Sequence, residues 1–385
     1  MVNFSILSPM QVYIGNGEIA RIPEILLQAK PTKGKVLVLT DFGVSATGVP
    51  KRISELVSSQ GFSVDLIDTV PREPYSGEVD LLASEARNKG FEYIIGIGGG
   101  SVLDTAKLLS ILLVKQSETV ESLLEKGIPG GGLPTIMVPT TAGTGSEATP
   151  IAIVALKEKK LKVGIVSAFI VPKSVILDPS CTVGLPQEWT ACTGVDALCH
   201  LLECYISKRA NPYSDLLALE GMRLIFSSLQ RAFENGADLD ARADMLLAAF
   251  YGGRCIASSS TTAVHALSYP LGGMYRIPHG VANAMLLTPV MEFNRDAVVE
   301  KLKQAVSRIG MSPILRESDP SVDFVYSIRK LVEYLKIPTS LRDFGISKKD
   351  IPSLTDRALQ VTRLLSNNPK PMSREDVEAI YERVL

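Results

Sequence analysis

Residues 93–101 read Tyr-Ile-Ile-Gly-Ile-Gly-Gly-Gly-Ser, and this stretch decides the fold. Its apolar run predicts a buried strand, and the pattern over Val102–Leu113 predicts a helix that follows at once. Glycines let a backbone approach a ligand, and a helix start offers free N–H groups to an anion, so we interpret the turn as a pyrophosphate site. It is not a GxGxxG fingerprint, because Ser101 stands at the third glycine position. The alternative is a tight strand-to-helix turn that Ser101 caps.

The same alternation of short apolar runs and helical patterns extends over the first half of the chain. We predict further strands at Lys35–Asp41, Ser63–Asp68, Thr135–Val138 and Ser174–Asp178, and helices at Val49–Gln60 and Glu78–Lys89. Strands separated by helices of this length predict a parallel sheet in a Rossmann-like α/β domain. The runs at 151–156 and 161–166 predict a β-hairpin with a charged tip at residues 157–160.

Long helical patterns replace this alternation after about residue 184. They cover residues 187–207, 211–233, 238–257, 260–270, 280–293, 296–309, 322–335, 348–359 and 373–384. Gly184 and Pro186 interrupt regular structure between the two patterns, so they mark the boundary. We therefore predict an α/β nucleotide-binding domain over 1–184 and an all-helical domain over 185–385.

The composition excludes several classes of protein. The 385 residues carry 40 basic and 41 acidic side chains, so nothing indicates a nucleic-acid or acidic-membrane partner. The longest apolar stretch, residues 93–114, is interrupted by glycines, Asp104 and Lys107, and it does not predict a membrane span. Five cysteines without a CxxC pair favour a reducing compartment, and the start of the chain does not resemble a signal peptide. We expect a soluble, cytoplasmic enzyme.

A second polar loop follows the strand at 135–138. It reads Pro139-Thr-Thr-Ala-Gly-Thr-Gly-Ser-Glu-Ala-Thr149. Open α/β sheets bind ligands beyond the carboxyl ends of their strands, although an ordinary loop rich in serine and threonine is the alternative. Asp41, at the end of the predicted strand at 35–41, could hydrogen-bond an adenosine ribose, and its charge would then repel the additional phosphate of NADP. The alternative is that Asp41 caps a turn.

The chain contains only three histidines, and their surroundings indicate a metal site. Asp196 and His200 stand at i and i+4, on one face of a helix, and His265 and His279 follow later. A cation such as Fe²⁺ or Zn²⁺ suits a shell of one carboxylate and imidazoles. A single histidine is more often an ordinary core or surface residue, but one metal site here would use all three.

These motifs together resemble the iron-containing (group III) alcohol dehydrogenase family, whose fold is dehydroquinate synthase-like. The resemblance rests on Gly98-Gly-Gly-Ser-Val-Leu-Asp-Thr-Ala-Lys107, Pro139-Thr-Thr-Ala-Gly-Thr-Gly-Ser-Glu147, Thr193-Gly-Val-Asp-Ala-Leu-Cys-His200 and Pro278-His-Gly-Val-Ala-Asn-Ala284. It implies an NAD-dependent oxidoreductase that transfers a hydride between NAD(H) and a primary or secondary alcohol, aldehyde or ketone. It also implies a homodimer.

The resemblance further implies a role for single residues. The metal ligands, for Fe²⁺ or Zn²⁺, are Asp196, His200, His265 and His279. The cofactor residues are Asp41, Gly98, Gly99, Gly100, Ser101, Asp104, Thr140, Thr141, Thr144, Ser146 and Lys162, and an acid at position 41 favours NAD. Tyr269 stands where many relatives have a histidine near the substrate, so we expect His265 and Tyr269 to serve catalysis. Because an unperturbed phenol is a poor base at neutral pH, bound water or a ribose hydroxyl are alternative proton carriers.

Two residues and three other functions stay open. Glu203, three residues after His200, either orients that imidazole or is a helix-surface acid. Arg276 either holds a substrate carboxylate, in a hydroxy-acid or semialdehyde dehydrogenase, or is an ordinary loop arginine. A dehydroquinate synthase-like lyase needs several basic residues to hold a sugar phosphate. In residues 193–203 and 261–280 the one lysine or arginine is Arg276, which argues against the lyase. The complete ligand set argues against a non-catalytic metal and nucleotide binder.

Overall fold

The computed structural model describes residues 3–29, 33–158, 161–310 and 319–385. The chain divides into a sheet unit, Leu7–Leu185 with Ala237–Gly253, and a helical unit, Met1–Ile6 with Pro186–Gly236 and Arg254–Leu385. The units are therefore not the contiguous halves 1–184 and 185–385 that the sequence predicts. Residues 237–253 pack with the sheet unit through a close backbone contact, because a Cβ on Gly253 would lie 2.2 Å from the carbonyl oxygen of Gly145.

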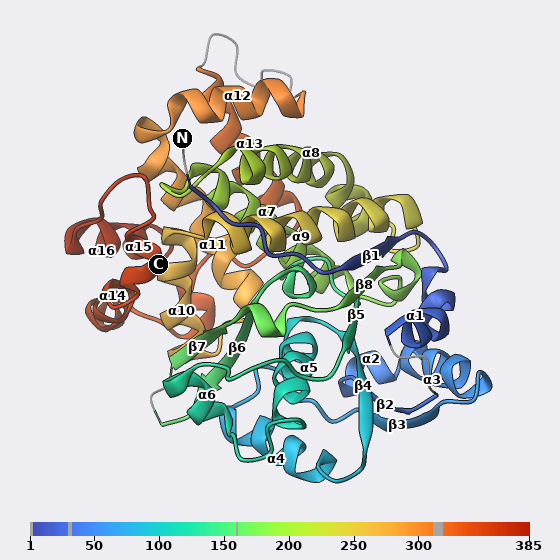
Figure 1. Ribbon diagram of the computed structural model, residues 1–385. Coiled ribbons are helices and arrows are strands. Elements are labelled where there is room, and N and C mark those ends of the chain that lie inside the picture. Colours follow the sequence, from blue (N-terminus) through green and yellow to red (C-terminus); the bar gives the residue numbers. More distant parts are fainter. Residues whose placement is uncertain (1–2, 30–32, 159–160, 311–318) are drawn as a thin grey trace. The chain divides into compact units, whose positions relative to one another are not determined.

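The sheet unit contains a six-stranded sheet in which every pair of neighbouring strands is parallel (Figure 1). Its strand order is β1-β8-β5-β4-β2-β3. The strands are β1 (Gln11–Ile14), β2 (Lys35–Leu39), β3 (Ser63–Ile67), β4 (Phe91–Gly98), β5 (Thr135–Pro139) and β8 (Ser174–Leu177). All the strands predicted for this sheet are present. β1 was not predicted, because four residues are too few for a periodic pattern and the strand is defined by its pairing with β8.

Helices cover both faces of this sheet, which explains why its central strands are apolar at successive positions. Alternate side chains of β2 and β4, such as Val38 and Ile95, are buried in a cluster with α1 (Ile22–Ala29) and α3 (Val49–Ser59). On the other face, α5 (Gly100–Leu112) packs closely at Gly96, where a Cβ would lie 3.0 Å from that of Ala106. The remaining helices of this unit are α2 (Phe42–Ser45), α4 (Ser76–Ala86) and α6 (Val120–Lys126).

The direction of chain progression reverses between β2 and β4. From β2 the chain passes to β3 on one side and then returns to β4 on the other side. Ligands of doubly wound sheets bind beyond the carboxyl ends of the strands at such a switch point. Asp41 follows β2 and the glycine turn follows β4, so the topology brings these two predicted elements to neighbouring positions.

The predicted hairpin is present as the antiparallel pair β6 (Ile151–Leu156) and β7 (Leu161–Val166). Residues 159–160 of its predicted tip lie outside the described residues. The N–H of Ala155 donates to the carbonyl oxygen of Pro74 at 3.0 Å. This bond joins the hairpin to the segment that precedes α4.

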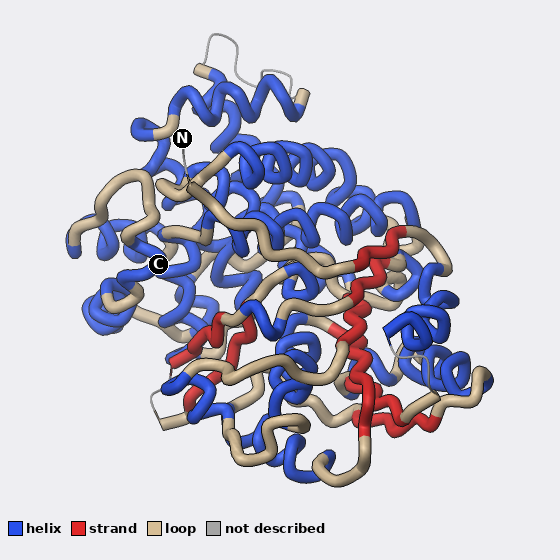
Figure 2. The backbone as a smooth tube through the Cα atoms, in the orientation of Figure 1, coloured by secondary structure: helices blue, strands red, loops and turns tan. Residues whose placement is uncertain are grey.

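The regular elements that the structure describes in the helical unit are all helices, and Figure 2 draws strands only in the sheet unit. The helices after residue 186 are α7 (Gln187–Ile206), α8 (Pro212–Glu234), α9 (Leu239–Ser259), α10 (Ala263–Tyr275), α11 (His279–Asn294), α12 (Val299–Ile309), α13 (Pro320–Tyr334), α14 (Ile351–Leu359), α15 (Thr362–Leu365) and α16 (Arg374–Arg383). α7 is buried at every residue from Gly194 to Ile206. The predicted fold class is confirmed. Among the described residues, no helix has both the length and the hydropathy that crossing a bilayer requires.

Candidate metal centre and cofactor loops

Four predicted metal ligands converge in the helical unit. α7 holds Asp196 and His200 one turn apart, His265 lies in the first turn of α10, and His279 is the first residue of α11. Asp196 Oδ1 lies 3.9 Å from Nε2 of His200, 3.9 Å from Nε2 of His265 and 3.7 Å from Nε2 of His279. All four ligand atoms lie within 4.8 Å of one another. The structure therefore brings the whole predicted set together.

A glycine lets the last ligand reach this cluster. A Cβ on Gly280 would lie 2.5 Å from the carbonyl oxygen of Cys192, so α11 can approach α7 this closely only without a side chain at position 280. His279 then stands at the rim, with 31 % of its side chain exposed, whereas the side chain of Asp196 is 3 % exposed. The cluster is thus accessible from the side of His279.

The charges of the cluster act on one another. Burial by itself raises the pKa of Asp196, but the charges of His200, His279 and His265 outweigh it and lower that pKa. A carboxylate that stays ionised in a buried site is the form that binds a cation.

Glu203 contacts His265, a partner that the sequence did not predict, and it is not the helix-surface acid that was one of its two interpretations. Its side chain is fully buried, and Oε2 accepts a hydrogen bond from Nδ1 of His265. Oε1 accepts from Oγ1 of Thr262 at 2.7 Å and from the N–H of Val264 at 2.6 Å, so the same carboxylate caps the start of α10. Burial lowers the pKa of His265, but the charge and hydrogen bond of Glu203 outweigh it and raise that pKa. With the ring proton held on Nδ1, Nε2 keeps its lone pair for a metal.

Asn283 belongs to the same cluster and was not predicted. Its Nδ2 donates to Asp196 Oδ1 at 2.6 Å and lies 3.2 Å from Nε2 of both His265 and His279. Asn283 follows His279 by four residues, the spacing that also joins Asp196 to His200. That repeated spacing is the signal that could have found it.

Tyr269 lies one turn after His265 on α10, and its ring centroid is 6.2 Å from that of His279. Burial raises its pKa above the ordinary 10.0, although the charge of Arg363 opposes the shift. The phenol therefore keeps its proton at neutral pH and can donate a hydrogen bond. Arg276 ends α10 with φ of 56° and an exposed side chain.

The glycine turn lies in the sheet unit, at the carboxyl end of β4. Gly99 precedes α5 without a side-chain cap, so Ser101 does not cap the helix. Instead, Oγ of Ser101 accepts a hydrogen bond from the N–H of Glu73 at 3.0 Å. The absence of a side-chain cap on this helix is compatible with an anion at its first N–H groups.

The second polar loop packs against this turn. A Cβ on Gly99 would lie 3.3 Å from the side chain of Thr141, and one on Gly100 would lie 2.9 Å from that of Thr144. Oγ1 of Thr140 is buried and has no hydrogen-bond partner among the described residues. Ser146 instead points into the protein, where its Oγ donates to Asp104 Oδ1 at 2.6 Å.

The two outlying cofactor candidates have partners of their own. Asp41 caps α2, because its Oδ1 accepts from the N–H of Val44 at 3.0 Å, which is the alternative role foreseen for it. Nζ of Lys162 lies 2.5 Å from Oε1 of Glu73, whose N–H bonds Ser101. Glu73 thus connects Lys162 to Ser101 of the glycine turn.

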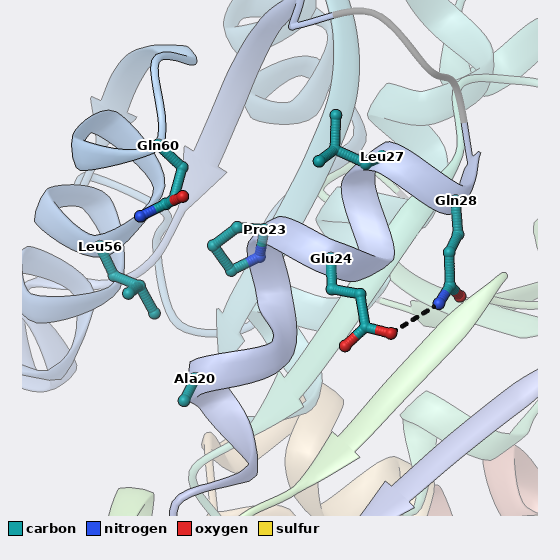
Figure 3. Close-up of a pocket in the computed structure, with 7 residues that line it drawn as sticks. All are labelled: Ala20, Pro23, Glu24, Leu27, Gln28, Leu56 and Gln60. Carbon is teal, nitrogen blue, oxygen red and sulfur yellow. Dashed lines mark hydrogen bonds between the residues drawn. The ribbon is translucent and has the colours of Figure 1, made fainter.

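Two surface hollows of the sheet unit contain none of the predicted site residues. The hollow in Figure 3 lies between α1 and α3 and is lined by Ala20, Pro23, Glu24, Leu27, Gln28, Leu56 and Gln60. Its one carboxylate, Glu24, accepts a hydrogen bond from Gln28 at 3.0 Å. The other hollow includes Phe91 and Thr135, the first residues of β4 and β5. It therefore lies at the amino ends of the strands, opposite the edge where such sheets bind ligands.

Comparison with known proteins agrees with this geometry over the whole chain. The family model described as "Iron-containing alcohol dehydrogenase" matches residues 9–179, and that described as "Fe-containing alcohol dehydrogenase family, C-terminal" matches residues 190–385. Long-chain-alcohol dehydrogenase 1 of Geobacillus thermodenitrificans is 36 % identical over 383 residues, which are 98 % of this chain and 95 % of the relative.

Solved structures give the same result. The crystal structure of a 1,3-propanediol oxidoreductase superposes with a TM-score of 0.93 at 31 % identity and covers 100 % of both chains. The sulfoacetaldehyde reductase of Bifidobacterium kashiwanohense, solved in complex with NAD⁺, has a TM-score of 0.89 at 26 % identity and covers 100 % of this chain and 98 % of its own. Two family matches and 36 % identity over nearly the full length show that this chain belongs to the iron-containing alcohol dehydrogenase family.

Proposed function

We propose that this protein is a metal-dependent alcohol dehydrogenase that uses NAD(H), and that it interconverts primary or secondary alcohols with aldehydes or ketones. The observation that carries the proposal is the buried cluster of Asp196, His200, His265 and His279. Membership of the family supports the reaction class. Two relatives, a long-chain-alcohol dehydrogenase and a sulfoacetaldehyde reductase solved with NAD⁺, support the substrate class and the cofactor.

The donor set fits a divalent cation. Metal–ligand bonds of about 2.0–2.2 Å in a tetrahedral site separate the donor atoms by roughly 3.3–3.6 Å. The observed separations of 3.7–3.9 Å from Asp196 Oδ1 are slightly wider than this. One carboxylate and three imidazoles suit Fe²⁺, which we propose from the family, and they also suit Zn²⁺.

The cofactor residues also fit a dinucleotide. A buried hydroxyl without a partner among the described residues, Oγ1 of Thr140, is available to a ligand, and Gly100 lets the Thr144 side chain approach the glycine turn closely. We assign the pyrophosphate to Gly98, Gly99, Gly100 and Ser101, and the neighbouring contacts to Thr140, Thr141, Thr144 and Lys162. Asp104 and Ser146 would support this region from inside the protein. Asp41 would accept from the adenosine ribose and favour NAD over NADP.

The proposed chemistry divides between the bound groups and the chain. A cation held by Asp196, His200, His265 and His279 would supply Lewis acidity toward the substrate oxygen, and NAD(H) held by the two loops would supply the hydride chemistry. The chain prepares His265 for this role, because Glu203 holds the ring proton on Nδ1 and leaves the lone pair of Nε2 for the cation. Tyr269, which keeps its proton at neutral pH, would donate a hydrogen bond to the substrate rather than act as its base.

A second candidate substrate class is a hydroxy acid or a semialdehyde. Arg363 on α15 is exposed, and its charge acts on Tyr269 beside the cluster. Together with Arg276, it could pair with the anionic end of a substrate. This preference would appear as a higher kcat/KM for an ω-hydroxy acid than for an alcohol of the same chain length. Equal values would leave the simple alcohol as the substrate.

The test of the proposed function is metal reconstitution in the absence of oxygen, followed by NAD(H)-linked assays with alcohols, aldehydes and hydroxy acids. The variant His265→Ala/His279→Ala should lose its bound metal, and its turnover should fall by more than about 100-fold. Glu300→Gln, on the exposed surface of α12, is the control and should keep both. Full turnover in the double variant would refute the proposed metal site.

We also propose a homodimer in a reducing compartment. Met10 and Ile14 are 77 % and 50 % exposed on and beside the edge strand β1, as a surface that pairs with a second copy would be. The five cysteines are all unpaired, which is typical of a reducing compartment. Light scattering of the purified protein would test the dimer, and a monomer at micromolar concentration would refute it.

A further inference from the structure

A buried lysine lies beneath the two proposed cofactor loops. Lys107 is on α5, and its side chain is 0 % exposed. Its Nζ donates to Oγ of Ser146 at 3.0 Å, to Oγ1 of Thr149 at 3.1 Å and to the carbonyl oxygen of Ile151 at 2.6 Å. The three acceptors all belong to the end of the second polar loop and the start of β6. One ammonium group therefore uses its three N–H bonds on this single segment.

Asp104 completes the attachment from the preceding turn of α5. Its Oδ1 lies 3.5 Å from Nζ of Lys107 and accepts from Oγ of Ser146 at 2.6 Å. Its Oδ2 accepts from the N–H of Ile153 at 3.0 Å. The pair of opposite charges on α5 thus holds both the loop and the first residues of the hairpin.

The same helix carries the glycine turn at its N-terminus. Gly100 begins α5, and the space beside it is occupied by Thr144 of the second loop. The loop therefore meets α5 at two places, at the glycine turn and two turns later at Lys107. A loop that loses the second attachment can move relative to the turn.

Packing alone does not account for a lysine at this position. Burying an ammonium group is costly, and an apolar residue of similar length would fill the space without that cost. Burial lowers the pKa of Lys107 against the opposing effects of Asp104 and Glu147. The Nζ bonds go to Ser146, Thr149 and Ile151, so a role of Lys107 in binding acts through the loop that these residues end.

We propose that Lys107 is a positioning residue for NAD, which holds the loop at 139–149 so that Thr140, Thr141 and Thr144 face the glycine turn. The inference rests on the proposed function and deepens it. Asp104 and Ser146, which the family resemblance associates with the cofactor, act in this arrangement through their bonds to Lys107.

The test is the variant Lys107→Met, which keeps the length of the side chain and removes the three N–H donors. If the binding-competent loop falls to a tenth of the population, the apparent Kd for NADH rises about tenfold. The loss should appear in the KM for NAD rather than in kcat, and the metal content should stay that of the wild type. NADH fluorescence titration measures the Kd.

Two further variants separate positioning from stability. Lys107→Met leaves the buried charge of Asp104 without its partner and should lower the melting temperature. Lys107→Met/Asp104→Asn removes both charges and should restore most of that loss. Its Kd for NADH should stay raised, because the bonds from Lys107 to residues 146–151 are still missing. Ser110→Ala is the matched control on the same helix. It removes a buried hydroxyl whose one hydrogen-bond partner among residues 3–29, 33–158, 161–310 and 319–385 is the carbonyl oxygen of Lys107, at 2.6 Å, and it should leave the Kd for NADH unchanged.

Each outcome bears on one claim. Wild-type affinity for NADH in Lys107→Met or in the double variant would overturn the positioning role of Lys107 and leave the proposed function standing. Failure of the folded, metal-loaded wild type to bind NADH would overturn the proposed function, and this inference with it. If Lys107→Met does not fold, Thr149→Val removes one of the three acceptors. It should raise the Kd for NADH about threefold, and an unchanged Kd would overturn the inference.

Discussion

The substitution Glu203→Gln tests how the chain prepares His265 to bind a metal. The carboxylate accepts bonds from Thr262 and Val264 on Oε1 and from His265 on Oε2. Glutamine keeps the shape but has one acceptor and one donor. If its oxygen takes the place of Oε1, its NH₂ group faces Nδ1 of His265, which must then accept a hydrogen bond. The neutral ring would carry its proton on Nε2, the atom that faces Asp196.

The cost can be estimated from the bond that is lost. To bind a cation, the ring must move its proton back to Nδ1, against an amide donor. This sacrifices one hydrogen bond to a charged group, which contributes about 1.5–3 kcal/mol. At about 1.4 kcal/mol per factor of ten, the affinity for Zn²⁺ or Fe²⁺ should fall roughly 10- to 100-fold.

Competition with a chromogenic chelator measures this affinity on the apo-protein. Glu188→Gln is the matched control, because it is the same change on the same helix but at an exposed position. Thermal unfolding should show that both variants fold. Wild-type affinity in Glu203→Gln would refute the reasoning, since the orientation of His265 would then not depend on the carboxylate.

Three other predictions concern the loops and the helix contact. Asp41→Ser keeps a side chain that can cap α2 but removes the charge, so the ratio of kcat/KM for NADP to that for NAD should rise at least about tenfold, and an unchanged ratio would exclude the charge as its cause. Burial raises the pKa of Glu147 from 4.5 to about 7 in the folded protein. Between pH 4.5 and 7, the folded protein therefore keeps a proton that the unfolded chain has released. The wild type should therefore lose up to about 3 kcal/mol of stability relative to Glu147→Gln as the pH rises from 5 to 8, and urea unfolding that shows a constant difference would contradict this. Gly280→Ala places a Cβ 2.5 Å from the carbonyl oxygen of Cys192, closer than the two atoms can approach, so the variant should bind less metal and have a lower melting temperature. A full metal complement would argue against the close approach of α11 to α7.

Much of the fold could be predicted because its signals are local. The apolar runs at 35–39 and 91–98 form strands wherever they are buried, and the helical patterns after residue 186 have the spacing of helices. Short elements were missed, since β1 and α15 each have four residues and depend on neighbours for their definition. The assignment of residues 237–253 to the sheet unit was also missed, because a close contact between Gly253 and Gly145 has no periodic signature.

By itself, the sequence determined the glycine turn after β4 and the pair Asp196 and His200, because both lie within a single turn of chain. Only the tertiary structure decided which distant groups complete these sites. Glu203 bonds His265, 62 residues further along, and Lys107 bonds Ser146, 39 residues away. Such partners follow from how buried helices and loops pack, since a buried charge must find its hydrogen bonds wherever the fold brings a donor or an acceptor.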